Sequence, residues 1–178
     1  RVLCEQFNVA RTSVREAIQG LATAGFIERR GNRAFVVEVV PGLELVLDSR
    51  KATVRNLFEV RRVIEPAMAG LVALRASEQV RREIADLASR PASGIDEFRL
   101  IDRQFHQMIA SACDNPVLSE VYSKALASLF NSEEFASLLY AENNKEEVSN
   151  IVESSSHAHV EIAEALLAGD QARTEKAV

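Results

Sequence analysis

Apolar residues recur at three- and four-residue spacing over most of this 178-residue chain, which is the pattern of helices that bury one face. The N-terminal part begins with a short helical run over residues 1–7, followed by a turn and a second helix over residues 12–24. Two β-rich runs come next, at residues 26–29 and 34–39, and residues 30–33 between them form a hairpin tip. The order helix, turn, helix, hairpin predicts a winged helix-turn-helix.

Pro41 and Gly42 interrupt the chain, and we place a domain boundary there, with a linker over residues 41–53. Every patterned segment beyond this point predicts a helix. The expected helices cover residues 54–76, 78–88, 96–112, 117–130, 135–140 and 154–168, with Gly169 ending the sixth and Asp170 beginning a last one. The sequence therefore predicts a mainly α protein, with a winged helix-turn-helix over residues 1–40 and an all-α antiparallel helical bundle over residues 54–178.

Composition narrows the class of protein. With 47% hydrophobic and 26% charged residues, the chain is ordinary for a soluble globular protein, and no apolar run approaches the roughly 18 residues of a membrane span. Cys4 and Cys113 form neither a disulfide framework nor a metal-binding CxxC pair, so we expect a reducing cytoplasm. Residues 1–40 carry six Arg and four Glu (+2), whereas the remaining chain carries 15 basic and 22 acidic residues (−7). A basic head on an acidic body favours contact with a polyanion through the head.

The second helix of a helix-turn-helix lies in the DNA major groove, and here that helix has its first turn at residues 11–15. Arg11 and Arg15 share one face, and Arg suits both phosphate and the guanine edge. The hydroxyls of Thr12 and Ser13 suit phosphate. The hairpin tip adds the basic residues Arg29, Arg30 and Arg33, and the expected inward stripe of the helix is Val14, Ala17, Ile18 and Leu21. The same pattern also fits a solvent-exposed amphipathic helix with scattered Arg residues.

The run EQFNVARTSVREAIQGLATAGFIERRGNRAFVV resembles the DNA-binding domain of the GntR family of bacterial transcription regulators, and within it the FadR-type branch. This resemblance implies that the Arg of the first helix, the two Arg of an RTxVRE-like motif and the wing residues around a Gly contact the operator. Matched by position, these residues are Arg1, Arg11, Arg15, Arg30 and Gly31. The chain departs from the family pattern at Ala10, where Ser or Thr is usual, and the first helix of the family's domain would precede Arg1.

Two ionisable residues lie on the apolar stripe of the expected helix 96–112, which consists of Phe98, Ile101, Phe105 and Ile109. Asp102 and His106 are four residues apart, so together they can hold a metal ion or form a buried hydrogen bond. His159 shares a stripe with Ile162 and Leu166, whereas His157 is expected to face solvent. Imidazole and carboxylate ligands suit Zn²⁺, Ni²⁺ or Mn²⁺, and three ligands would leave such a site incomplete or open.

The stretches FEVRRVIEPAMAGLVALRAS, IDRQFHQMIASACDNPVL and HVEIAEALLAGD resemble the FCD domain, the all-helical effector-binding domain of FadR-type regulators. The resemblance implies a divalent metal held by one Asp and three His, of which Asp102, His106 and His159 are matched and the last His falls beyond Val178. It also implies a small carboxylate effector bound to the metal, with Arg61 facing the pocket. The alternative is that Arg61 or Arg62 pairs with Glu59 or Glu65 along the helix. Pocket residues within 127–150 are not assigned by the pattern.

These observations together predict a bacterial, nucleoid-associated cytoplasmic regulator rather than an enzyme. We expect a repressor that binds a palindromic operator in double-stranded DNA as a homodimer, without a membrane, and that senses a small carboxylate through a metal site. One alternative is the same fold with a metal-free effector pocket. A remote alternative is a small metallohydrolase that uses Asp102, His106 and His159, against which stands the absence of any HExxH or GxSxG motif.

Overall fold

A computed structural model of the chain describes residues 2–23, 26–30, 33–36 and 52–178. It divides into two compact units, Arg1–Val46 and Leu47–Val178, and each unit is described by itself. The expected domain boundary at Pro41 and Gly42 lies outside the described residues. In the described part of the chain, no helix is long and apolar enough to cross a membrane.

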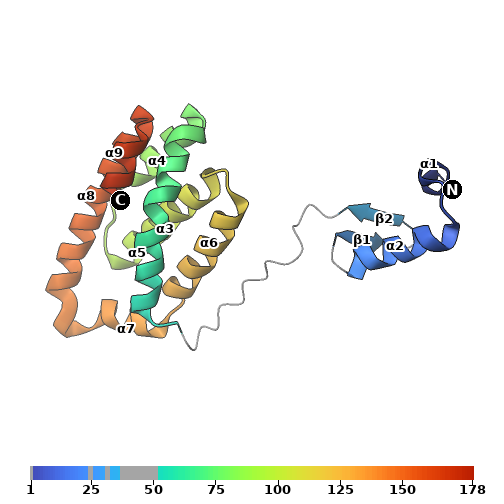
Figure 1. The fold of residues 1–178 in the computed structure, drawn as a ribbon. Helices are drawn as coiled ribbons and strands as arrows, with labels where there is room; N and C mark the ends of the chain where they lie inside the picture. The colour runs from blue at the N-terminus through green and yellow to red at the C-terminus, as the bar shows by residue number, and fades with distance from the viewer. Residues whose placement is uncertain (1, 24–25, 31–32, 37–51) are drawn as a thin grey trace. The chain divides into compact units, whose positions relative to one another are not determined.

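The first unit has the expected order of helix, helix and hairpin (Figure 1). Its elements are α1 (Val2–Phe7), α2 (Arg11–Thr23), β1 (Ile27–Arg30) and β2 (Arg33–Val36). The turn between the helices places Asn8 at φ 51°, a left-handed conformation that Asn tolerates better than most residues. The strands pair antiparallel, with Ile27 opposite Val36 and Arg30 opposite Arg33. The winged helix-turn-helix order is therefore confirmed, although the expected helix end at residue 24 and the strand residues 37–39 lie outside the described residues.

The inward stripe of α2 differs from its expectation. Val14 and Ile18 are partly buried, as predicted, but Ala17 and Leu21 are exposed and Ala22 is partly buried instead. The partly buried positions follow a strict four-residue spacing, which keeps them on one narrow face of the helix. Ala17 and Leu21 come three residues after Val14 and Ile18, so they lie on the flank of that face.

The second unit is a helical bundle whose described elements run from α3 to α9 (Figure 1). They are α3 (Val54–Arg75), α4 (Glu78–Ala88), α5 (Ile95–Ala112), α6 (Pro116–Phe130), α7 (Glu133–Tyr140), the 3₁₀ turn η1 (Glu142–Asn144), α8 (Lys145–Ala168) and α9 (Gln171–Ala177). Helix α3 packs against α5, α6, α8 and α9, while α4 packs against α5 and α8. The mainly α class is confirmed.

Side-chain caps explain where most of these helices begin. Thr53 and Asn56 form a reciprocal capping box at the start of α3. The side chains of Ser77 and Asp170 accept hydrogen bonds from backbone N–H groups of the first turns of α4 and α9. Gly169 ends α8 in the left-handed conformation at φ 67°, where a Cβ would be strained. These are the boundaries that the sequence placed most accurately.

The bundle core is one apolar cluster that joins helices α3, α4, α5, α6 and α8. Its largest fully buried members include Tyr122, Phe105 and Met68, and the predicted stripe of α5 is buried throughout. A smaller cluster of Val54, Leu57, Ala125 and Leu129 joins the start of α3 to α6. The core therefore fixes α3, α5 and α8 relative to one another, and these are the helices that carry the site residues.

Helix α8 is the element that the sequence predicted least well, because it begins at Lys145 rather than at residue 154. Its first half is polar, and its apolar residues Val148, Ile151 and Val152 line a cavity instead of a packed core. A face that borders a cavity needs fewer apolar residues than one that is packed on both sides. The weak pattern of this half-helix is therefore a consequence of its position.

Candidate metal and effector site

The residues expected to contact DNA lie on the first unit. Arg11, Thr12, Ser13 and Arg15 occupy the first turns of α2 and are all exposed. Arg33 begins β2 and is exposed, and Arg30 ends β1, whereas Arg1 and Gly31 lie outside the described residues. An exposed first turn is what contact with a major groove requires.

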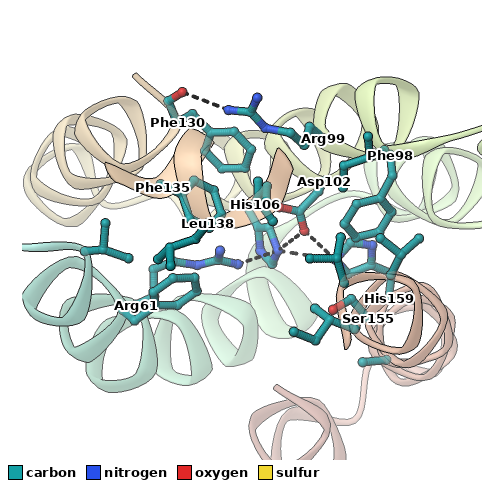
Figure 2. Close-up of a pocket in the computed structure, with 18 of the residues that line it drawn as sticks. Arg61, Phe98, Arg99, Asp102, His106, Phe130, Phe135, Leu138, Ser155 and His159 are labelled. Atoms are coloured by element: carbon teal, nitrogen blue, oxygen red, sulfur yellow. Dashed lines mark hydrogen bonds and ion pairs between the residues drawn. The ribbon is translucent and has the colours of Figure 1, made fainter. Parts of the chain in front are cut away.

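The three residues expected to bind a metal converge in the second unit (Figure 2). One ligand atom from each of Asp102, His106 and His159 lies within 4.8 Å of the other two. Asp102 Oδ1 is 3.1 Å from His106 Nε2 and 3.2 Å from His159 Nε2, and the two nitrogens are 3.3 Å apart. Both histidines are buried, whereas His157 is exposed, as the sequence predicted.

Surrounding groups fix the orientation of both imidazoles. His106 Nδ1 contacts Glu65 Oε1 on α3, which leaves His106 Nε2 directed at Asp102 and His159. The ring of His159 stacks on Phe105 at 4.3 Å and lies nearly parallel to Phe98 at 6.3 Å. A carboxylate behind a histidine is the usual outer support of a metal ligand. The donor set and its support therefore fit a divalent metal ion.

Glu65 and Tyr122 belong to this site but were not predicted as site residues. Glu65 is only 5% exposed, and it accepts hydrogen bonds from the Tyr122 hydroxyl at 2.7 Å and from Arg61 Nε at 3.4 Å. The sequence suggested Glu65 only as an ion-pair partner of Arg61 or Arg62 along the helix, in the alternative to Arg61 facing the pocket. Tyr122 comes from α6, 57 residues away in the chain from Glu65, so no local spacing could have revealed it.

Arg61 faces the pocket and also pairs with Glu65 along the helix, so both arrangements expected from the sequence occur together. It pairs with Glu65 along α3, and its Nη2 lies 2.6 Å from His106 Nε2 (Figure 2). Because a guanidinium can only donate, Nε2 of His106 must accept this bond and carries no proton in this arrangement. A metal ion or a proton on Nε2 would need the same lone pair. Arg61 and a metal ion therefore compete for one nitrogen atom.

The electrostatics of the site favour ionised carboxylates. Burial alone would raise the pKa of Glu65, but His106, Arg61 and the Tyr122 hydroxyl lower it from 4.5 to about 2. Burial would also raise the pKa of Asp102, but its contacts with the two histidines and the positive charge of Arg61 lower that pKa. Burial and the negative charge of Glu65 raise the pKa of the Tyr122 hydroxyl, which stays protonated as a donor. Asp102 thus presents a negative charge at the point where the ligand atoms meet, and Glu65 places a second one behind His106.

A cavity of about 900 Å³ opens from this site and is lined by α3, α5, α7, α8 and the end of α6. Arg61, Asp102, His106 and His159 form part of its wall. Phe135 and Leu138 of α7, together with Val148 and Val152 of α8, line it elsewhere. Of these, Phe135, Leu138 and Val148 come from the region 127–150, which the sequence pattern left unassigned.

Comparison with known proteins agrees with this organisation. Residues 1–37 match the family described as "Bacterial regulatory proteins, gntR family", and residues 56–178 match the FCD domain. A gntR-type DNA-binding domain followed by an FCD domain defines a class of transcription regulators, and this chain is a transcription regulator, not an enzyme. The chain belongs to the GntR family and carries an FCD domain.

The similar curated proteins are named as transcription regulators. The chain is 26% identical to "HTH-type transcriptional regulator LutR" of Bacillus subtilis, over all of this chain and 84% of that protein. It is 32% identical to "Uxu operon transcriptional regulator" of Escherichia coli, over 70% of this chain and 52% of the other, and 28% identical to the E. coli "Galactonate operon transcriptional repressor", over 71% and 61%. The chain thus spans only about half the length of several curated relatives.

Among solved structures, the chain resembles "Streptococcus agalactiae GntR" with a TM-score of 0.58 and 23% sequence identity, over 98% of this chain and 80% of the other. A likeness at this identity concerns the fold. It supports the succession of a winged helix-turn-helix and an all-helical domain. The metallohydrolase alternative is discarded because the two family matches and the curated relatives are those of transcription regulators.

Proposed function

We propose that this regulator is a cytoplasmic repressor that binds a palindromic operator as a homodimer and responds to a carboxylate metabolite. In this proposal Asp102, His106 and His159 hold a divalent metal ion, Zn²⁺, Ni²⁺ or Mn²⁺, at the end of the cavity. The observation that carries the proposal is the convergence of these three ligand atoms beside Arg61 in a chain with a GntR head. A relative named "Galactonate operon transcriptional repressor" supports the assignment as a repressor.

Different groups of the site would have different roles in effector binding. A bound metal ion supplies an open coordination position for a carboxylate oxygen. Arg61 can present two parallel N–H groups to the same carboxylate, which is the geometry that guanidinium groups favour. Glu65 holds both His106 and Arg61, so it orients a metal ligand and an anion-binding group together. Metal and effector binding are thereby linked through one buried carboxylate.

Effector binding would regulate transcription through a shift between two states of the dimer. The ligand can change operator affinity only by its differential affinity for the two states. Two recognition helices in successive major grooves require a defined spacing. A change in the helical domains that alters the spacing of the heads therefore changes operator affinity.

The metal site is tested by elemental analysis of the full chain purified without chelator or polyhistidine tag. We expect about one metal ion per subunit, because three ligand atoms, from the partly buried Asp102 and two buried histidines, meet at one point. The His106→Ala variant should lose the metal. The His157→Ala variant removes an exposed imidazole two residues from His159 and should keep it. Equal metal content in both variants, or none in the wild type, would favour the metal-free pocket instead.

Replacing Arg61 with Gln should separate metal binding from effector binding. We expect metal affinity to be maintained or increased, because the substitution removes a cation that now occupies the lone pair of His106 Nε2. Carboxylate binding should weaken by about 1.5–3 kcal/mol, the usual contribution of a charge-assisted hydrogen bond. Isothermal titration with metal, and then with a carboxylate, measures both. Arg82→Gln, which removes the same charge from an exposed ion pair on α4, should change neither.

A further inference from the structure

Arg99 is a cationic residue of the cavity wall that the proposed function does not use. It lies on α5, three residues before Asp102, so it is about 4.5 Å further along the helix axis. Figure 2 shows Arg99 and Arg61 reaching the cavity from different helices, with Phe135 and Leu138 between them in that view. The cavity therefore has a second positive group away from the metal site.

The position of the Arg99 guanidinium is fixed by the protein. Its Nη2 donates to the carbonyl oxygen of Phe130 at 3.1 Å, and its Nη1 donates to the Tyr140 hydroxyl at 3.2 Å. It also lies 5.8 Å from the ring centre of Phe135 and 5.6 Å from that of Tyr140. Tyr140 donates its own proton to Asp96, so its oxygen is available as an acceptor for Arg99. The guanidinium is thus held in one place before any ligand arrives.

The positive charge of Arg99 is not paired directly. Among the described residues, no carboxylate forms an ion pair with it, and Asp96 is connected to it only through Tyr140. Two of its five N–H groups are used by Phe130 and Tyr140, and its Nε is buried without a hydrogen-bond partner. A cation held in this way beside a cavity is suited to an anionic group of a ligand.

The residues that line the cavity indicate the chemistry of the part of a ligand that would lie between Arg61 and Arg99. Four phenylalanines line it, namely Phe58, Phe98, Phe130 and Phe135. The other polar side chains in its wall, apart from those around the metal ligands and Arg99, are Asn144, Ser155 and the charged residues Arg55, Glu59, Arg62 and Glu147. A polyhydroxylated sugar acid would place its hydroxyls against these four aromatic rings, which offer them no hydrogen-bond partner. An aromatic or alicyclic body would fit it, and about 900 Å³ accommodates one.

We propose that Arg99 forms a second anion-binding subsite, so that the effector is a carboxylate with an apolar ring body and a second anionic group at its far end. This inference rests on the proposed function for the first carboxylate, which would bind beside Arg61. Arg99 then determines specificity by selecting two-ended acids over acids with one charged end.

The test compares ligands that differ by one acid group. Terephthalate and 4-methylbenzoate have the same ring and nearly the same length, as do isophthalate and 3-methylbenzoate, and gluconate serves as the hydroxylated acid. Each is titrated calorimetrically into the metal-loaded full chain. In the wild type we expect at least one diacid to bind tenfold or more tightly than its methyl counterpart, and more tightly than gluconate. In Arg99→Gln this ratio should fall to about one.

Tyr140→Phe is the matched control, because it removes the hydroxyl that tethers Arg99 but leaves the charge, so the diacid preference should persist. A ratio near one in the wild type, a ratio unchanged in Arg99→Gln, or no binding of any diacid would overturn the proposal. Repeating the titrations after chelation separates the two hypotheses. If the diacid preference survives without metal, the metal anchor is wrong and the Arg99 subsite stands. If binding needs metal but shows no preference for diacids, the Arg99 subsite alone is wrong.

Discussion

Replacing Glu65 with Ala should lower the free energy of unfolding of the metal-free protein by about 3–5 kcal/mol, the usual cost of breaking a buried ion pair from one side. The substitution leaves three buried groups without their common acceptor: the guanidinium of Arg61, Nδ1 of His106 and the hydroxyl of Tyr122. It also creates a space beside the main core cluster, since Tyr122 is fully buried there. Urea unfolding followed by the loss of helical circular dichroism measures the effect.

Two comparisons make this prediction specific. Glu59→Ala removes a carboxylate from the exposed pair with Arg55 on the same helix and should cost less than about 1 kcal/mol. The second comparison uses pH. Because the pKa of Glu65 is lowered from 4.5 to about 2, its stabilisation is present above pH 4.5 and is lost as the pH falls toward 2. The stability difference between the wild type and Glu65→Gln should therefore shrink below pH 4.5, and a difference that grew there would contradict the assignment.

Replacing both Arg11 and Arg15 with Ala should weaken operator binding by about 2–6 kcal/mol, since each good base contact by Arg contributes about 1–3 kcal/mol. Both side chains are exposed at the start of α2, on the face where a major groove would lie. The operator can be selected from a pool of random duplexes by the full chain, and affinity measured by fluorescence anisotropy at a fixed salt concentration.

A charge-matched variant separates specific contact from general electrostatics. Arg82→Ala combined with Arg90→Ala removes two exposed positive charges from the helical domain. This control should leave operator affinity nearly unchanged. Equal losses in the two double variants would show that net charge, rather than α2, determines binding.

Most of the fold could be predicted from the sequence, because helix-capping residues mark the ends of the helices and apolar stripes mark their buried faces. Ser77, Asn115, Gly169 and Asp170 mark helix ends by local chemistry, so those boundaries fell within a residue or two. The apolar residues of α5 recur at helical spacing and are buried, so the prediction that Asp102 and His106 lie on the inward face of this helix was correct. The early start of α8 escaped prediction because its inner face borders a cavity, so its apolar pattern is sparse.

Only part of the site could be predicted from the sequence, because residue spacing shows which side chains share a helix face but not which helices pack together. Asp102 and His106 share a helix, and His159 lies on an equally clear stripe, so the convergence of three ligands could be anticipated. Glu65 was considered only as a partner of Arg61, because contact between its carboxylate and His106 depends on the packing of α3 against α5. Arg99 gave no signal at all, since its partners Phe130 and Tyr140 are 31 and 41 residues away in the chain.

Helix α7 contributes Phe135 and Leu138 to the cavity, yet none of its residues is fully buried, whereas α5 buries six. Substitutions in α7 therefore cost little folding energy, because surface and half-buried positions tolerate change better than core positions do. This part of the cavity wall is therefore distinct from the buried residues of α5. A library confined to α7 could be screened for responses to new compounds with a small stability penalty, which makes this helix the natural starting point for engineering a transcriptional biosensor.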